Sequence, residues 1–141
     1  ALAGRDPPDL ERVRADIAAY ADPIIEVVRL GDAMRVKLVN NLLFAVNLRV
    51  AVEAATLAQS LGVSPADLAR VLSHCSGDSY AMRLLASGFA PEELAMGARP
   101  YLAKDVAVVR TVLAPTGVDL GLLDELAGWV DPDHSRDRSH S

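Results

Sequence analysis

Hydrophobic residues dominate one long stretch near the start of the chain. From Asp32 to Leu61 there is no glycine or proline, and residues that favour helix prevail. At about 1.5 Å per residue, this stretch predicts a helix about 45 Å long. Projected at about 100° per residue, its polar positions fall into two sets. We assign one set to solvent because it forms a narrow stripe: Arg35, Arg49, Glu53, Thr56 and Ser60.

The second polar set lies on the opposite side of the same helix and consists of Lys37, Asn40 and Asn41. Their spacing directs all three side chains to one region of space. At a cleft, desolvation would favour the neutral amine of Lys37, which is then a usable proton carrier, and the amides could orient a carboxylate or hydroxyl. The alternative is that Lys37 extends into solvent and the amides satisfy neighbouring backbone groups.

Shorter helices are expected downstream of the long one. Gly62 ends the long helix, and Ser64-Pro-Ala-Asp67 is a capping box that starts a helix running to about Cys75. Further helices are predicted at about 79–86, 99–113 and 120–130, with a loop over 87–98. The expected core face of the helix over 99–113 consists of Leu102, Val106, Val109 and Leu113.

The residues before the long helix follow a different pattern. Residues 7–21 predict an amphipathic helix, and the β-branched run over 23–28 predicts a strand. Because a single strand has no ladder partner, we expect residues 1–31 to be the end of an upstream α/β domain. Residues 32–130 then form a helical domain, and 131–141 form a polar tail expected to be disordered.

Composition supports a mainly α fold: a helical bundle built around one long helix, with a short N-terminal helix–strand remnant. Of the 141 residues, 51% are hydrophobic but only 4% aromatic, so the apolar mass is mostly alanine, valine and leucine. A net charge of −5 with scattered basic residues argues against a nucleic-acid partner.

The remaining composition signals exclude several kinds of site. Cys75 is the only cysteine, which rules out a disulfide framework and favours a buried structural thiol. The three histidines have no metal-ligand spacing, so no metal site is expected. Polar residues within the long helix argue against a membrane span, and without a secretory signal we expect a cytoplasmic protein.

Two motifs carry a resemblance to a known family. The segment Gly31-Asp-Ala-Met-Arg-Val-Lys37-Leu-Val-Asn40-Asn41 is similar to Gly-x-Gly-x-x-x-Lys-x-x-Asn-Asn, with Ala33 at the second glycine. Later, Tyr101-Leu-Ala-Lys104-Asp105-Val resembles a Lys-Asp-Leu segment. Both motifs, in this order, are typical of the C-terminal helical domain of β-hydroxyacid dehydrogenases. That family includes 3-hydroxyisobutyrate dehydrogenase and relatives of 6-phosphogluconate dehydrogenase.

The resemblance implies a role for each motif residue. Lys37 would be the general acid/base for the substrate hydroxyl, Asn40 and Asn41 would bind substrate, and Lys104 would reach the NAD or NADP cofactor. The substrate would be a small 3-hydroxy acid or the matching semialdehyde. Because the sequence holds no Gly-x-Gly-x-x-Gly turn, we expect the chain to be inactive without a Rossmann domain.

The long helix also predicts association between subunits. Apolar residues occupy more than one face of this helix, and five of them are consecutive over 42–46. This indicates burial against more than one neighbour. We therefore expect a homodimer or higher oligomer. The alternative function is a non-catalytic helical dimerisation module, in which Lys37 and the asparagines are structural.

Overall fold

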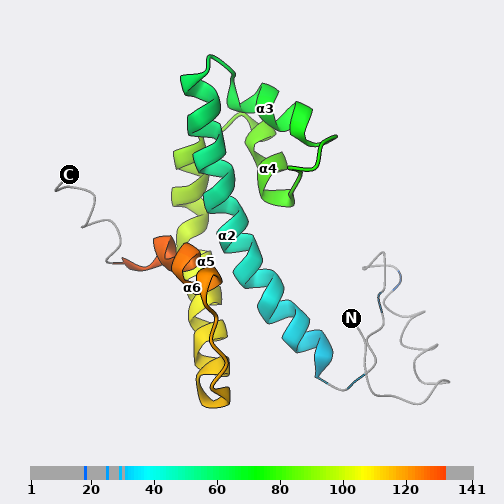
Figure 1. The fold of residues 1–141 in the computed structure, drawn as a ribbon, viewed down its shortest axis with the longest axis vertical. Helices are drawn as coiled ribbons and strands as arrows, with labels where there is room; N and C mark the ends of the chain where they lie inside the picture. Colours follow the sequence, from blue (N-terminus) through cyan, green and yellow to red (C-terminus); the bar gives the residue numbers. More distant parts are fainter. Residues whose placement is uncertain (1–17, 19–24, 26–28, 30, 133–141) are drawn as a thin grey trace. The chain divides into compact units, whose positions relative to one another are not determined.

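A computed structural model describes residues 18, 25, 29 and 31–132 of the chain (Figure 1). Helices and turns make up this part, which contains no strand, and the mainly α class is confirmed. The helix predicted over 7–21, the strand predicted over 23–28 and the tail from residue 133 lie outside the described residues. The chain divides into two compact units, residues 1–39 and 40–141, and each is described by itself.

The long helix is α2, which spans Asp32–Ser60 and confirms the predicted element. Gly31 precedes it with a φ of 90°, a left-handed conformation that favours glycine, and its carbonyl accepts from the backbone N–H of Arg35 at 3.1 Å. Ala33 already lies in regular helix, where alanine is more favourable than the glycine of the family motif.

The end of α2 is a Schellman motif centred on Gly62, which has a φ of 80°. The Val63 N–H donates to the Ala58 carbonyl at 2.9 Å, and the Gly62 N–H donates to the Gln59 carbonyl at 3.0 Å. These bonds satisfy carbonyls that the helix leaves without partners. The predicted stop at Gly62 is confirmed.

A small helical pair follows α2. It consists of α3 (Pro65–Leu72), then α4 (Tyr80–Leu84), which continues directly into the 3-10 helix η1 (Leu85–Ser87). The Ser64 hydroxyl caps α3 by accepting from the Asp67 N–H at 3.1 Å and donating to the Asp67 carboxylate at 2.8 Å. The predicted helix start at Ser64 is confirmed.

The expectation of a buried Cys75 is wrong. Cys75 is exposed in the turn after α3, and its thiol donates to the Val71 carbonyl at 3.4 Å. Because α3 ends at Leu72, the thiol lies past the helical face that packs inward. The helix predicted to run to about Cys75 ends at Leu72 instead.

The second long helix, α5, spans Pro91–Leu113, so the loop predicted over 87–98 is wrong for most of its length. Pro91 occupies the first turn, where its missing N–H costs nothing, and Glu92 and Glu93 complement the helix dipole there. Gly97 and Pro100 both lie inside the helix. Pro100 is exposed, and tertiary packing of the other face outweighs the cost of these two residues.

Three short helical elements follow α5. These are the 3-10 helix η2 (Ala114–Thr116), α6 (Leu122–Ala127) and the 3-10 helix η3 (Gly128–Val130). The Trp129 indole Nε1 donates to the Ala45 carbonyl of α2 at 3.0 Å. This bond joins residues 84 positions apart in the sequence.

The core of residues 40–132 draws on α2, α5, the small helical pair with η1, and residues 127–131, which we call the C-terminal turn. The helical pair and η1 contribute Ala69, Ala81, Met82 and Leu85. The buried residues of α2 in this unit include Leu42, Ala45, Val46, Leu48, Ala51, Val52, Ala55 and Ala58. Of the face predicted for α5, Leu102, Val106 and Val109 are buried and Leu113 is half-buried. Ala127, Trp129 and Val130 are also buried.

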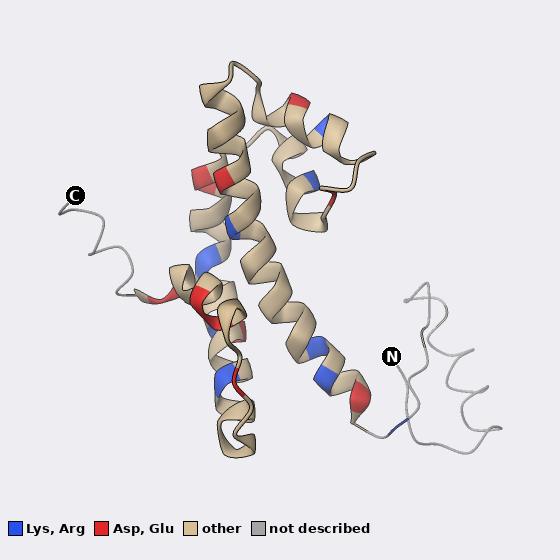
Figure 2. Ribbon diagram, in the orientation of Figure 1, with Lys and Arg blue, Asp and Glu red and all other residues tan. Residues whose placement is uncertain are grey.

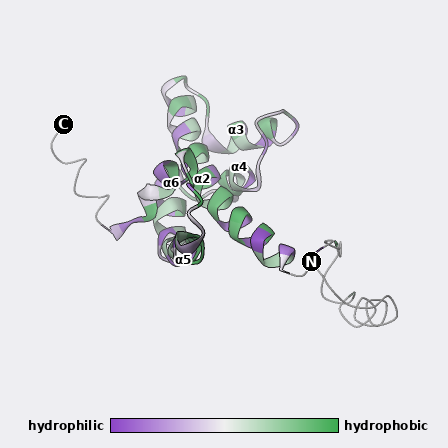
Figure 3. Cartoon of the chain, turned by 60° about the horizontal axis from the view of Figure 1, so that its bottom comes forward, coloured by the Kyte–Doolittle hydropathy of each residue, from purple (hydrophilic) through white to green (hydrophobic). Residues whose placement is uncertain are grey.

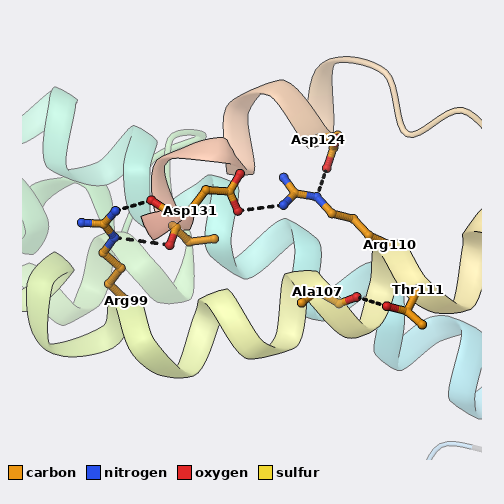
Figure 4. Close-up of polar contacts among 7 residues, drawn as sticks. Arg99, Ala107, Arg110, Thr111, Asp124 and Asp131 are labelled. Atoms are coloured by element: carbon orange, nitrogen blue, oxygen red, sulfur yellow. Dashed lines mark hydrogen bonds and ion pairs between the residues drawn. The ribbon is translucent and has the colours of Figure 1, made fainter. Parts of the chain in front are cut away.

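Two arginines of α5 hold the C-terminal turn (Figure 4). Arg99 donates to the Val130 carbonyl at 3.3 Å and also to the Asp131 carbonyl. Arg110 forms ion pairs with the carboxylates of Asp124 at 2.6 Å and Asp131 at 2.7 Å. The Asp131 hydrogen bond is the main cause that raises the pKa of Arg110, although burial opposes it. The turn is therefore fixed at two points along α5.

Charged residues are scattered over the described part of the chain, without a basic cluster (Figure 2). By length and composition alone, α2 could cross a membrane, because its most apolar window has a mean hydropathy of 1.3. Within the fold, 44% of that window is buried.

Candidate functional site

Lys37 lies in the second turn of α2 and is exposed. It forms no hydrogen bond or ion pair with any residue that the structure describes. Its neighbour Arg35, in contrast, pairs with Asp32 at 2.8 Å. Lys37 therefore offers an amine that no described side chain neutralises.

Asn40 and Asn41 follow on the same helix, three and four residues after Lys37. Asn40 is exposed and Asn41 is half-buried. Both amides carry donors and acceptors that no described residue uses, so they are available to bind a polar ligand.

A hollow of about 390 Å³ opens beside Asn40. Its walls are formed by α2 and the start of α4: Asn40, Leu43, Phe44, Asn47, Tyr80 and Ala81. The rings of Phe44 and Tyr80 are in contact, with their centroids 5.8 Å apart and tilted by 53°. The hollow thus combines two amides with an aromatic and aliphatic wall.

Asn47 and Tyr80 were not among the residues predicted for a site. Asn47 could have been found, because it lies seven residues after Asn40 and so projects from the same side of the helix. Nothing in the sequence around Tyr80 indicates that it reaches α2, because that contact depends on the tertiary packing of α4.

Lys104 lies in α5 and is exposed, pointing away from the buried face of that helix. No described residue pairs with it. An exposed ammonium without a carboxylate partner suits the phosphates of a dinucleotide, so the residue type fits the cofactor that the motif implies.

The fold and these residues define a helical domain that carries the lysine and asparagine motif of a hydroxyacid dehydrogenase. Comparison with protein-family models matches residues 31–132 to the family described as the NAD-binding domain of NADP-dependent 3-hydroxyisobutyrate dehydrogenase. The chain belongs to this family, and the predicted membership is confirmed. Comparisons with curated proteins and with solved structures gave no significant match.

The matched family also fixes the class of cofactor. It is a family of NAD(P)-dependent dehydrogenases, so the NAD or NADP that the motifs implied is confirmed at this level. The match spans both motifs, from Gly31 through Lys104 and its flanking residues. The chain therefore belongs to a family of oxidoreductases.

Proposed function

We propose that this chain is the C-terminal catalytic and dimerisation domain of a cytoplasmic NAD(P)-dependent 3-hydroxyacid dehydrogenase, or semialdehyde reductase. The observation that carries the proposal is the family match over residues 31–132, which contains Lys37, Asn40, Asn41 and Lys104 at motif spacing. The exposure of Lys37 and Lys104 supports it, because both amines are available to groups from outside the described residues.

In this proposal Lys37 moves the proton. During oxidation its neutral amine accepts the proton of the substrate hydroxyl, while the hydrogen on the same carbon leaves as a hydride. NAD(P), when bound, would supply the hydride acceptor for the oxidation and the hydride donor for the reduction. During reduction the ammonium form of Lys37 gives its proton to the carbonyl oxygen of the semialdehyde.

The other motif residues position the reactants. The amide N–H groups of Asn40 and Asn41 donate to the substrate carboxylate, which fixes the hydroxyl carbon relative to Lys37. The ammonium of Lys104 would hold the phosphates of the cofactor. The phosphate-binding turn belongs to a separate nucleotide-binding domain, so the 141-residue chain alone carries no activity.

Replacing Lys37 in the enzyme assembled with its nucleotide-binding domain tests the proposal. Lys37→Ala should lower kcat by about 10²–10⁴-fold, because it removes the group that moves the proton. Cofactor affinity, measured by fluorescence titration with NADPH and NADH, should stay nearly unchanged.

Arg35→Ala is the matched control, because Arg35 is also an exposed cation of the first turns of α2 but pairs with Asp32. It should leave turnover intact. Undiminished turnover in Lys37→Ala would reject the catalytic role and leave the helical dimerisation module as the function of this domain.

A further inference from the structure

The hollow beside Asn40 is larger than the smallest 3-hydroxy acids require. Its volume is about 390 Å³, within the range of about 300–1,000 Å³ that is typical of pockets for drug-sized ligands. It lies between α2 and α4, and hydrophobic residues recur along α2 (Figure 3). A substrate bound at Asn40 therefore has unfilled space next to it, and that space can take a substituent.

The walls of the hollow carry no charge. All of the described residues that line it are neutral: Asn40, Leu43, Phe44, Asn47, Tyr80 and Ala81. A phosphate, a second carboxylate or an ammonium placed there would lose hydration without gaining a partner of opposite charge. The lining therefore favours an uncharged substituent.

Polar and apolar groups alternate along the hollow. Asn40 and Asn47 both lie on α2, and Phe44 lies between them in the helix. The Phe44 ring contacts the Tyr80 ring, with the centroids 5.8 Å apart. The side-chain amide of Asn47 is exposed and forms no hydrogen bond with any described residue. A ligand that extends from Asn40 to Asn47 would thus meet an amide, an aromatic wall and a second amide.

The spacing of the two amides sets the length of such a ligand. Asn47 lies seven residues after Asn40, which corresponds to about 10.5 Å along the helix axis. With a hydrogen bond of about 2.9 Å at each end, the polar atoms of the ligand lie about 5–10 Å apart, depending on whether these bonds run along or across the helix. An extended chain of about two to four carbons beyond the carbon that carries the carboxylate spans that distance.

The proposed reaction fixes where this chain is attached. In the oxidation of a 3-hydroxy acid to a semialdehyde, the hydroxyl carbon C3 is at the end of the carbon chain, so only C2 can carry a substituent. C2 is next to the carboxylate that Asn40 binds in the proposed function, on which this inference rests. A substituent on C2 therefore begins at the rim of the hollow.

We infer that the hollow is the specificity pocket for the C2 substituent, and that Asn47 selects an uncharged substituent with a hydrogen-bonding group at its end. The substrate class is then 3-hydroxypropanoates that carry on C2 a chain of about two to four carbons ending in a hydroxyl or an amide. The Phe44 and Tyr80 rings pack against the carbons of this chain. The Asn47 amide forms a hydrogen bond with its terminal group, which makes Asn47 a specificity-determining residue.

A series of substrates tests the inference in the enzyme assembled with its nucleotide-binding domain. The 3-hydroxypropanoates of the series differ only in the C2 substituent: methyl, butyl, 4-hydroxybutyl and 3-carboxypropyl. We expect kcat/KM to rise about tenfold from methyl to butyl and about fivefold more for hydroxybutyl. The carboxypropyl compound should fall below the methyl one because of its charge. Equal values for methyl and hydroxybutyl, or a carboxypropyl value as high as that of hydroxybutyl, would overturn the inference.

Asn47→Leu removes the amide at nearly constant size. It should lower the ratio of kcat/KM for the hydroxybutyl substrate over the butyl substrate about fivefold, because the terminal hydroxyl loses its partner. Gln59→Leu is the matched control, because Gln59 is an exposed amide of α2 outside the hollow. It should leave the ratio unchanged. An unchanged ratio in Asn47→Leu would reject Asn47 as a specificity-determining residue.

A binding experiment with the 141-residue chain separates this inference from the catalytic role of Lys37. The probe is 6-hydroxyhexanoate, which has the carboxylate and the tail but no hydroxyl on C3. In a titration followed by NMR, the side-chain amide signal of Asn47 should shift and that of Gln59 should not. Hexanoate should bind about fivefold more weakly.

The two proposals then fail in different ways. A shift at Asn47 together with undiminished turnover in Lys37→Ala would reject the catalytic role and leave the specificity pocket in place. No shift at Asn47, or equal affinity for 6-hydroxyhexanoate and hexanoate, would overturn the specificity pocket whatever the turnover of Lys37→Ala.

Discussion

Trp129 shows what a single residue contributes to this fold. Its indole is 7% exposed and donates a hydrogen bond of 3.0 Å to the Ala45 carbonyl. Within α2 that carbonyl also lies in the helical hydrogen-bond ladder, so the indole is an additional donor to it. The side chain therefore joins the C-terminal turn to α2 both by packing and by this hydrogen bond.

Trp129→Phe should destabilise the chain by about 1–2 kcal/mol, because it removes one hydrogen bond and some buried surface but keeps an aromatic ring. Trp129→Ala should cost about 3–5 kcal/mol, because it leaves a cavity. Chemical denaturation followed by circular dichroism measures both. Equal stability of the phenylalanine variant and wild type would show that the indole bond contributes nothing.

At the same scale, the motif residues could be read from the sequence, whereas the wall of the hollow could not. Lys37, Asn40 and Asn41 are close together on one helix, so spacing alone relates them. Tyr80 reaches α2 only through packing, and the Trp129 bond joins residues with no local relation. Exposure of Cys75 was missed because it depends on one turn at the end of a helix.

At the scale of elements, helix boundaries followed the sequence wherever a local signal set them. Ser64 and Gly62 form the cap and the Schellman motif that their residue types predict. The start of α5 was missed because Gly88, Pro91 and Gly97 resemble loop residues. Packing of Leu102 and Val106 supplies the stability that local propensity lacks.

The cap of α3 predicts a small dependence of stability on acid. The Arg70 hydrogen bond is the main cause that lowers the pKa of Asp67, and the Ser64 hydroxyl contributes. A carboxylate whose pKa is lower in the folded state stabilises the fold above its unfolded value, near pH 4, and loses that effect as pH falls through the folded value.

Asp67→Asn should therefore flatten the acid limb of the stability curve below about pH 4, by a small amount because the group is fully exposed. Urea denaturation at a series of pH values measures this. Glu92→Gln, an exposed carboxylate of the first turn of α5, is the comparison. If the free energy of unfolding of Asp67→Asn falls with acid as steeply as that of the wild type, protonation of Asp67 does not affect stability.

At the scale of the whole chain, described here over residues 40–132, the C-terminal turn holds the helices together. Arg110 bridges Asp124 and Asp131, and its side chain is 32% exposed (Figure 4). Composition and periodicity predicted the helical class and the long central helix. They did not predict the ion pairs of Arg110 with Asp124 and Asp131. These residues come from segments that meet only because of the path of the loop after α5.

Arg110→Met should destabilise the chain by about 1 kcal/mol, because it leaves two partly buried carboxylates without their cation. Arg70→Met, which breaks the exposed pair with Asp67, should cost about 0.5 kcal/mol or less. Thermal denaturation at low and high salt separates them, because salt screens the exposed pair more. A smaller loss of stability in Arg110→Met than in Arg70→Met would show that the Arg110 ion pairs do not stabilise the C-terminal turn.

The position of Trp129 has a practical consequence. The chain contains one tryptophan, so selectively excited indole emission arises from a single place. That place is the junction between the last turn and α2. A red shift of the emission during titration with denaturant would report separation of that junction. If the emission shifts at a lower denaturant concentration than the helical circular dichroism signal is lost, the C-terminal turn separates from α2 before the helices unfold.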